Sequence, residues 1–415
     1  MATINPFEPY RYTAKAGDPS RLLTQPYDKI TPEMRERYLA SSPYNLVRVI
    51  LGERRDTDND SENVYTRAAR YLDDWIREGI LARDPSPGLY AYFQDFTVPD
   101  SGEKLTRKGF IGIGKIEDYS AGVVFRHEQT LSGPKKDRLE LLRHTRAHFG
   151  QIFMLYPDPQ GAVDKLLDAA SAGPPAMNVA DEYQARHRLW PIVNPSEIAQ
   201  IQELMRDKKL LIADGHHRYE TALAYRDEHP GDGPAQFVMM TFVNMHSPGL
   251  KILATHRVLR HVENFDATRF FEKAANHAWS VAACATLDVL KARMAARDSK
   301  RVQIGVVVPG TEPRLMQRAR KKDEMDVPAL HHDVLQSLLG ISEDAVREEQ
   351  YIQYVRGIDA AAAEVYDRGA QVAFLLEPTP IDDMARIAFS GGVMPQKSTD
   401  FYPKLLSGVT IYRLV

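Results

Sequence analysis

The chain is organised around the segment KKLLIADGHHRYETALAY, residues 208–225. Its first part, 208–213, is a short apolar run that predicts a buried strand. Its last part places Ala222, Leu223 and Tyr225 at helical spacing, so a helix is expected to begin directly after the strand. An acid, a glycine, two histidines and an arginine stand between the two elements. This composition predicts that the working site of an enzyme lies at residues 214–218.

Each residue type in this loop suits an anionic ligand. Gly215 lets the backbone turn sharply and approach a ligand without a Cβ in the way. The first amides of the following helix lack intrahelical partners and favour negative charge, and Arg218 adds a planar fork for phosphate or carboxylate. His216 and His217 can donate to phosphate oxygens or shuttle a proton near neutral pH. Asp214 is a candidate Mg²⁺ ligand and a candidate catalytic base.

Two other interpretations of the segment are weaker. A helix whose polar start merely faces water needs one capping residue, whereas here five adjacent site-type residues follow an apolar strand. A zinc site would need ligands at characteristic spacings. Adjacent histidines at a helix start, with no Cys or Glu at zinc spacing nearby, argue against it.

The rest of the sequence predicts an α+β fold with mixed sheets and flanking helices. An apolar stripe in 61–80 predicts an amphipathic helix, and the β-rich runs 89–96 and 107–116 predict neighbouring antiparallel strands. Further strands are expected at 151–156, 236–245, 250–256, 302–308 and 371–377, and further helices at 135–148, 195–206, 265–276, 328–338 and 380–389.

The length of 415 residues predicts two domains, because a single core usually stops growing well below this size. Beyond about residue 262 the pattern changes to a longer alternation of helices and strands. We therefore expect an N-terminal α+β domain over 1–262, which carries the loop at 214–218, and a C-terminal α/β domain over 263–415. The loop at 394–399 in the second domain is expected to contribute to the site.

Composition indicates where the protein is located and which classes of partner it lacks. The net charge of −3 and the lack of a Lys- or Arg-rich helix argue against a nucleic-acid partner. The single cysteine, Cys284, cannot form an internal disulfide. The N-terminal residues lack the apolar core of a signal peptide, and no stretch of 18 apolar residues occurs that would span a membrane. We expect a cytoplasmic protein without a membrane partner, and homo-oligomerisation stays open.

Two further clusters carry candidate site residues. His127 and Glu128 follow an apolar run, where such a pair can supply a base or a ligand. A solvated turn before a helix explains them equally well. Near the C-terminus, Lys397 and Lys404 stand in an irregular loop and can bind phosphate as point charges. The alternative is an exposed loop, but its aromatic residues speak against full exposure.

Seven motifs, in the same order, resemble the bacterial family called domain of unknown function 1015. They are PYD (26–28), PYN (43–45), HEQT (127–130), DRL (137–139), IADGHHRYETAL (212–223), THR (255–257) and MPQKST (394–399). The resemblance runs nearly end to end. The family is regarded as distantly related to the ParB/sulfiredoxin-like fold, which includes the free-serine kinases, so the resemblance implies such a core plus a larger C-terminal α/β region.

The resemblance also implies roles for individual residues. In the related kinases an acid-Gly-His-x-Arg loop cradles nucleotide phosphates, so Gly215, His216, His217 and Arg218 are expected to bind phosphate. Asp214, Glu128 and His216 are the catalytic candidates, Glu128 because those kinases use an upstream glutamate as base. Lys397 and Lys404 are expected to assist phosphate binding. The substrate-binding candidates are His127, Thr130, Arg138, His256, Arg257, Ser398 and Thr399, although a His-Arg pair at a strand end such as 256–257 is more often structural.

The implied activity is a Mg²⁺-dependent, kinase-like phosphotransfer between a nucleotide, ATP or ADP, and a small hydroxyl substrate, with serine or phosphoserine as the first candidate. Asp214 is the expected Mg²⁺ ligand. Two alternatives stay open. One is a ParB-like nucleotide-responsive regulatory protein, which fits poorly with the net charge because it would bind DNA. The other is a phosphatase or hydrolase that uses the same anion site.

Overall fold

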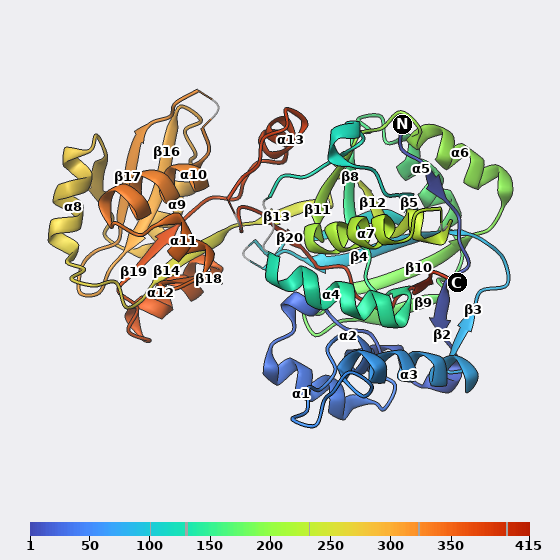
Figure 1. Ribbon diagram of the computed structural model, residues 1–415. Coiled ribbons are helices and arrows are strands. Elements are labelled where there is room, and N and C mark those ends of the chain that lie inside the picture. The colour runs from blue at the N-terminus through green and yellow to red at the C-terminus, as the bar shows by residue number, and fades with distance from the viewer. Residues whose placement is uncertain (100, 129–131, 232, 323, 396) are drawn as a thin grey trace. The chain divides into compact units, whose positions relative to one another are not determined.

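A mixed nine-stranded sheet forms the framework of the computed structural model, which describes residues 1–415 except 100, 129–131, 232, 323 and 396 (Figure 1). Its strand order is β6-β11-β8-β12-β5-β4-β10-β9, with β1 paired to β5. The bounds are β1 Ile4–Asn5, β4 Leu89–Thr97, β5 Lys104–Lys115, β6 Val124–Phe125, β8 Ile152–Tyr156, β9 Met177–Ala180, β10 Arg186–Ile192, β11 Leu210–Asp214 and β12 Phe237–Asn244. The expected antiparallel neighbours at 89–96 and 107–116 are confirmed as β4 and β5. The α+β class is confirmed as well.

The two faces of this sheet differ in character. One face packs an apolar core in which Phe110 and Phe242 stack with ring centroids 4.9 Å apart. The other face carries buried polar side chains among its apolar ones: Gln94, Arg107 and Gln151 are each no more than 1% exposed. Buried polar groups need partners. This face is therefore the part of the fold where specific polar contacts are expected.

Helices of the first 251 residues flank the sheet and add a second core. Their bounds are α1 Pro32–Ser41, α2 Val47–Ile50, α3 Val64–Arg77, α4 Ser132–Thr145, α5 Ala162–Ala170, α6 Pro195–Met205 and α7 His216–Glu228. The helix expected at 61–80 is α3, and Asn63 caps it with a reciprocal capping box. Its residues Leu72 and Trp75 pack with Leu141 of α4 and with Ile411. The chain's C-terminal end thus belongs to the packing of its N-terminal part.

The second sheet has the order β15-β17-β16-β19-β14-β18. Its strands are β14 Thr255–Leu259, β15 Ser280–Ala283, β16 Arg301–Val307, β17 Arg314–Ala319, β18 Ile352–Arg356 and β19 Val372–Leu375. Helices between 267 and 389 are α8 Ala267–Asn276, α9 Leu287–Ala295, α10 Asp326–Ala329, the π-helix η6 Leu330–Leu338, α11 Glu343–Arg347, α12 Ile358–Tyr366 and α13 Ile381–Phe389. Short pairs are β2 Tyr10–Tyr12 with β3 Leu81–Arg83, β7 Ala147–His148 with β21 Tyr412–Arg413, and β13 Lys251–Leu253 with β20 Asp400–Tyr402.

The chain divides into two compact units. The first comprises Met1–Lys251, Ala388–Gly391 and Pro403–Val415, and the second comprises Ile252–Ile387 and Gly392–Tyr402. This division differs from the expected single boundary at 262/263 for two reasons. Strand β14 pairs with β18 and β19 and so belongs to the second sheet. The C-terminal end pairs with the first unit, where Tyr412 lies opposite His148.

None of the helices in the described part of the chain combines the length and the apolarity that crossing a lipid bilayer requires.

Candidate functional site

The junction of β11 and α7 lies in the first unit and has the predicted strand–glycine–helix geometry. Gly215 is the N-cap of α7 with φ +97°, a left-handed conformation that favours glycine. A Cβ at this position would lie 3.0–3.1 Å from the Arg218 guanidinium. In the described part of the chain, no N-cap side chain bonds to the helix start. The first amides of this 13-residue helix are thus available to an anion.

The Asp214 carboxylate ends β11 between two cations. Lys404 Nζ is 3.4 Å from Oδ2, and Arg218 Nη2 is 3.8 Å from Oδ1. Burial raises the pKa of Asp214, but Lys404, Arg218 and Lys29 together outweigh it and hold this pKa well below its ordinary value. The carboxylate is therefore ionised at neutral pH and is a weak base.

Two buried imidazoles, those of His127 and His216, lie near the Asp214 carboxylate and are both neutral at pH 7. His127 and His216 meet edge to face with ring centroids 4.8 Å apart. Burial lowers the pKa of His127 to about 4 and the pKa of His216 well below its ordinary value, with each other's proximity adding to the effect at His216. His127 Nδ1 lies 2.7 Å from the carbonyl oxygen of Ile212. Since a carbonyl only accepts, this nitrogen carries the proton.

His216 Nε2 is the reactive atom that this arrangement leaves open. The residue is 8% exposed, and its Nε2 is buried without a hydrogen-bond partner among the described residues. An orphaned buried polar atom is costly and calls for a ligand or an ordered water. A neutral imidazole with an open nitrogen beside an uncapped helix start can accept a proton from a bound hydroxyl.

Gln151 belongs to the same corner, although its sequence context predicts only a strand start. Arg218 Nη1 donates to its carbonyl oxygen. Asp214 pairs with Phe153, so continuing this antiparallel register places Gln151 opposite the first turn of α7. Its carboxamide is fully buried, and neither its oxygen nor its nitrogen has a partner in the described part of the chain. The signal in the sequence is a polar residue at the head of the apolar run 151–156.

A buried arginine fixes the segment that carries Lys404. Arg107 donates to Gln94 Oε1 and to the backbone oxygen of Pro403, and Gln94 Nε2 donates to the backbone oxygen of Lys404 at 2.8 Å. The Arg107 guanidinium also lies 4.6 Å from the centre of the Phe153 ring. Alternation along β5 gives no sign of this role, which depends on a contact almost 300 residues away in sequence.

A family model described as "Protein of unknown function (DUF1015)" matches residues 4–338, which is most of the chain and includes the β11–α7 junction. The chain belongs to this family. No curated protein matches the DUF1015 chain.

Solved structures overlap the DUF1015 chain only loosely. A conserved hypothetical protein from Pyrococcus furiosus is 10% identical, with a TM-score of 0.36 over 68% of this chain and 89% of its own. A free serine kinase in complex with AMP is 11% identical, with a TM-score of 0.36 over 67% and 83%. C-terminally truncated SbnI from Staphylococcus aureus is 12% identical, with a TM-score of 0.35 over 71% and 85%. These values are too low to assign an activity.

Glu128, His217 and Arg138 are the other predicted residues of the first unit that the structure describes. Glu128 follows His127, beyond the end of β6, and is half-buried. Strand β6 runs parallel to β11, so their carboxyl ends meet at one edge. His217 lies in the first turn of α7. Arg138 on α4 donates to the backbone oxygen of Ile50 at 2.6 Å. Thr130 lies outside the described residues.

The predicted residues of the second unit form a cluster of their own. Arg257 is buried, donates to the backbone oxygen of Lys397 at 3.0 Å and stacks on Tyr354. His256 Nδ1 accepts the Leu376 amide at 3.2 Å, and burial lowers the pKa of His256 to about 4. Ser398 accepts a hydrogen bond from Thr379 through its backbone oxygen, and Thr399 follows it. A contribution of Lys397, Ser398 and Thr399 to the α7 site stays a prediction.

We predict that Gly215→Ala impairs anion binding beyond its effect on stability. The left-handed φ alone should reduce the free energy of unfolding by roughly 1–2 kcal/mol, and the new Cβ displaces Arg218. Gly161→Ala is the matched control, because Gly161 is also a left-handed N-cap but its nearest neighbour is 3.7 Å away. Urea unfolding and pyrophosphate titration measure both effects. Equal pyrophosphate affinity in the two variants would contradict the crowding argument.

We predict that His127→Gln flattens the pH dependence of stability between pH 6.5 and 4. In this window the unfolded histidine binds a proton that the folded one rejects, so the free energy of unfolding falls as the pH drops. With a folded pKa of about 4, the full effect is on the order of 3 kcal/mol. Urea unfolding at pH 7 and pH 5 measures it, with His229→Gln as control. The same slope in wild type and His127→Gln would show that His127 is not buried in neutral form.

Proposed function

We propose that this DUF1015 protein is a Mg²⁺-dependent phosphotransferase that moves a phosphoryl group between ATP or ADP and a small hydroxyl substrate, with serine or phosphoserine as the first candidate. The observation that carries the proposal is the open, neutral His216 Nε2 beside the uncapped start of α7. A proton acceptor and an anion site in one corner are the minimum that phosphoryl transfer to a hydroxyl needs.

Phosphoryl oxygens would be held by the amides at the start of α7, by Arg218 and by Lys404. Both side chains are close to Asp214 in the structure. Arg218 is only 16% exposed and Lys404 only 10% exposed, so their charges act in a partly dehydrated setting. Such positioned charges stabilise negative charge that develops during transfer. Asp214 keeps both cations in place before the nucleotide binds.

The base in this proposal is His216. The acceptor hydroxyl loses its proton to Nε2 as its oxygen forms the new bond to phosphorus, and the bond from phosphorus to the leaving oxygen of the nucleotide breaks. The cations beside Asp214 hold its pKa low, and burial also lowers the pKa of His216, so the choice of His216 rests on its open Nε2. Glu128 is the alternative base, since it follows His127 at the same edge of the sheet. The Gln151 carboxamide, with donor and acceptor both open, would hold the polar groups of the acceptor.

The residues present fit Mg²⁺ only together with a nucleotide. Mg²⁺ is commonly held by one or two carboxylates plus substrate phosphates, and Asp214 supplies one carboxylate. In the described residues, no group of three or more His, Cys, Asp or Glu is placed to hold a metal ion. The bound ion would neutralise charge on the phosphates. Asp214 and the phosphates would hold it.

We predict that Arg218→Ala weakens ADP binding by about 1.5–3 kcal/mol, the value of a charge-assisted hydrogen bond. Isothermal titration calorimetry with ADP and Mg²⁺ measures the loss. Arg226→Ala on the same helix is the control, because Arg226 pairs with Asp118 and Asp227 away from the helix start. If both variants bind ADP like the wild type, the phosphate site lies elsewhere.

Phosphorus NMR tests the activity itself. The protein is incubated with Mg²⁺ and serine plus ATP or ADP, and with phosphoserine plus ADP or AMP. We expect a new phosphoester or nucleotide signal in at least one direction. His216→Gln should abolish this signal, whereas His229→Gln at the far end of α7 should retain it. A signal of unchanged rate in His216→Gln would remove His216 as the base, and Glu128→Gln then tests the alternative. No signal in any tube, with ADP still bound, would overturn phosphotransfer to serine.

A further inference from the structure

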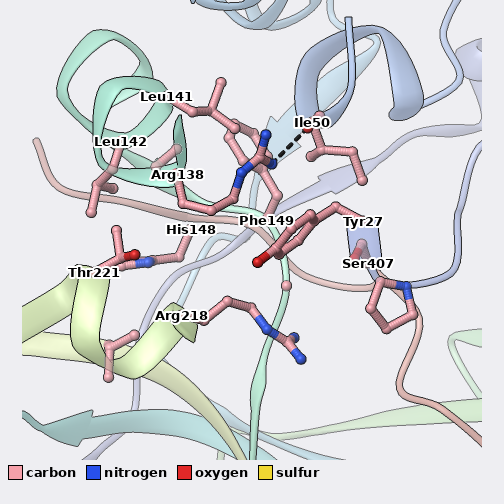
Figure 2. A pocket seen from close by; sticks show the side chains of 14 residues that line it. Tyr27, Ile50, Arg138, Leu141, Leu142, His148, Phe149, Arg218, Thr221 and Ser407 are labelled. Carbon is pink, nitrogen blue, oxygen red and sulfur yellow. Dashed lines mark hydrogen bonds between the residues drawn. The ribbon is translucent and has the colours of Figure 1, made fainter. Parts of the chain in front are cut away.

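A pocket in the first unit lies directly beside Arg218 and has no role in the mechanism above. Figure 2 shows its lining side chains, with Arg218 on one side, Arg138 on another and Tyr27 between them. Its walls are mostly apolar and come from Ile50, Leu141, Leu142, Ala147, Phe149 and Val238. Arg218 and Thr221, three residues apart on α7, both line it. The pocket therefore runs along the helix from its first turn.

The polar groups in this pocket other than the two arginines are uncharged. Burial raises the pKa of Tyr27, so its hydroxyl stays protonated. Burial lowers the pKa of His148 to about 4, so its imidazole is neutral at pH 7. The Tyr27 side chain points into the pocket (Figure 2), and its hydroxyl has no hydrogen-bond partner in the described part of the chain. Ser407 contributes a further hydroxyl.

Two flat groups line one wall of the pocket. The Arg138 guanidinium lies 4.4 Å from the centre of the Tyr27 ring, and both side chains line the pocket that Arg218 also lines. Aromatic rings and guanidinium planes are the surfaces on which nucleobases stack. At the other side, a Cβ on Gly150 would lie 3.2 Å from both Arg218 Nη1 and Ser407 Oγ. Glycine at this position thus leaves room for the Arg218 guanidinium beside Ser407.

We propose that this pocket binds the nucleobase of the nucleotide whose phosphates lie at the start of α7. This inference rests on the proposed function and adds the location of the base. A second anion would not match the apolar walls, because burying a charge among them is costly. An alkyl chain would leave the neutral hydroxyls and the imidazole unused. A planar, uncharged heterocycle can pack its faces against the apolar walls and form hydrogen bonds from its edges to the polar groups.

The test compares ADP with pyrophosphate by calorimetry on the full chain in the presence of Mg²⁺. Wild type should bind ADP more tightly than pyrophosphate. Tyr27→Leu should weaken ADP binding by roughly 5- to 150-fold, as expected for the loss of one base–aromatic stack, and should leave pyrophosphate affinity unchanged. Leu142→Trp fills the pocket and should act in the same direction. Leu166→Trp on α5 is the control for a bulky substitution, because Leu166 packs against the main core.

The outcomes separate this inference from the proposed function. If pyrophosphate binds but ADP binds no more tightly, or if ADP affinity survives in both Tyr27→Leu and Leu142→Trp, the nucleobase assignment is overturned and the anion site stands. If neither ADP nor pyrophosphate binds to the wild type, the proposed function fails, and the nucleobase assignment fails with it. Urea unfolding of each variant distinguishes a lost site from a lost fold, and Tyr27→Leu decides if Leu142→Trp does not fold.

Discussion

The first unit depends on one electrostatic constraint: a carboxylate at the end of a buried strand needs cations around it. Asp214 has Lys404 and Arg218 as its partners. Lys404 comes from a segment 190 residues further along the chain that returns to the first unit. Arg107 and Gln94 bind the backbone of Pro403 and Lys404, and Ser407 pairs with Thr24 through backbone hydrogen bonds. Two buried polar side chains of the sheet thus hold the backbone that carries this lysine.

Burial and nearby charges also give the Asp214 carboxylate and the two imidazoles different roles in the site. In water a carboxylate and an imidazole differ by a few pKa units, and either can serve as a base near neutral pH. Here the cations lower the pKa of Asp214, while dehydration keeps His127 and His216 neutral. The negative charge therefore holds the cations of the site in place, and His216 Nε2 is the open nitrogen of the site. Residue types alone do not distinguish these roles, because environment sets them.

Local features of the fold were predictable from the sequence, whereas long-range ones were not. The β11–Gly215–α7 junction, helix α3 and the β4–β5 pair follow from short-range periodicity and from glycine chemistry. The ends of the units depend on which strands pair: β14 joins the second sheet, and the last residues join the first. For the same reason Lys397 and Lys404, seven residues apart, belong to different units. Gln151 and Arg107 look like ordinary strand residues until their neighbours across the sheet are known.

The predicted residues of the second unit and the residues at the β11–α7 junction also differ in the hydrogen bonds that their side chains make within the protein. Arg257 donates to the backbone oxygens of Thr255 and Lys397 and stacks on Tyr354, and His256 accepts a backbone amide. Such contacts fix the conformation of a loop. At the β11–α7 junction, His216 Nε2 and the Gln151 carboxamide are buried without partners among the described residues. Unsatisfied polar atoms cost stability, so a ligand that bonds to these atoms at the junction would stabilise the fold.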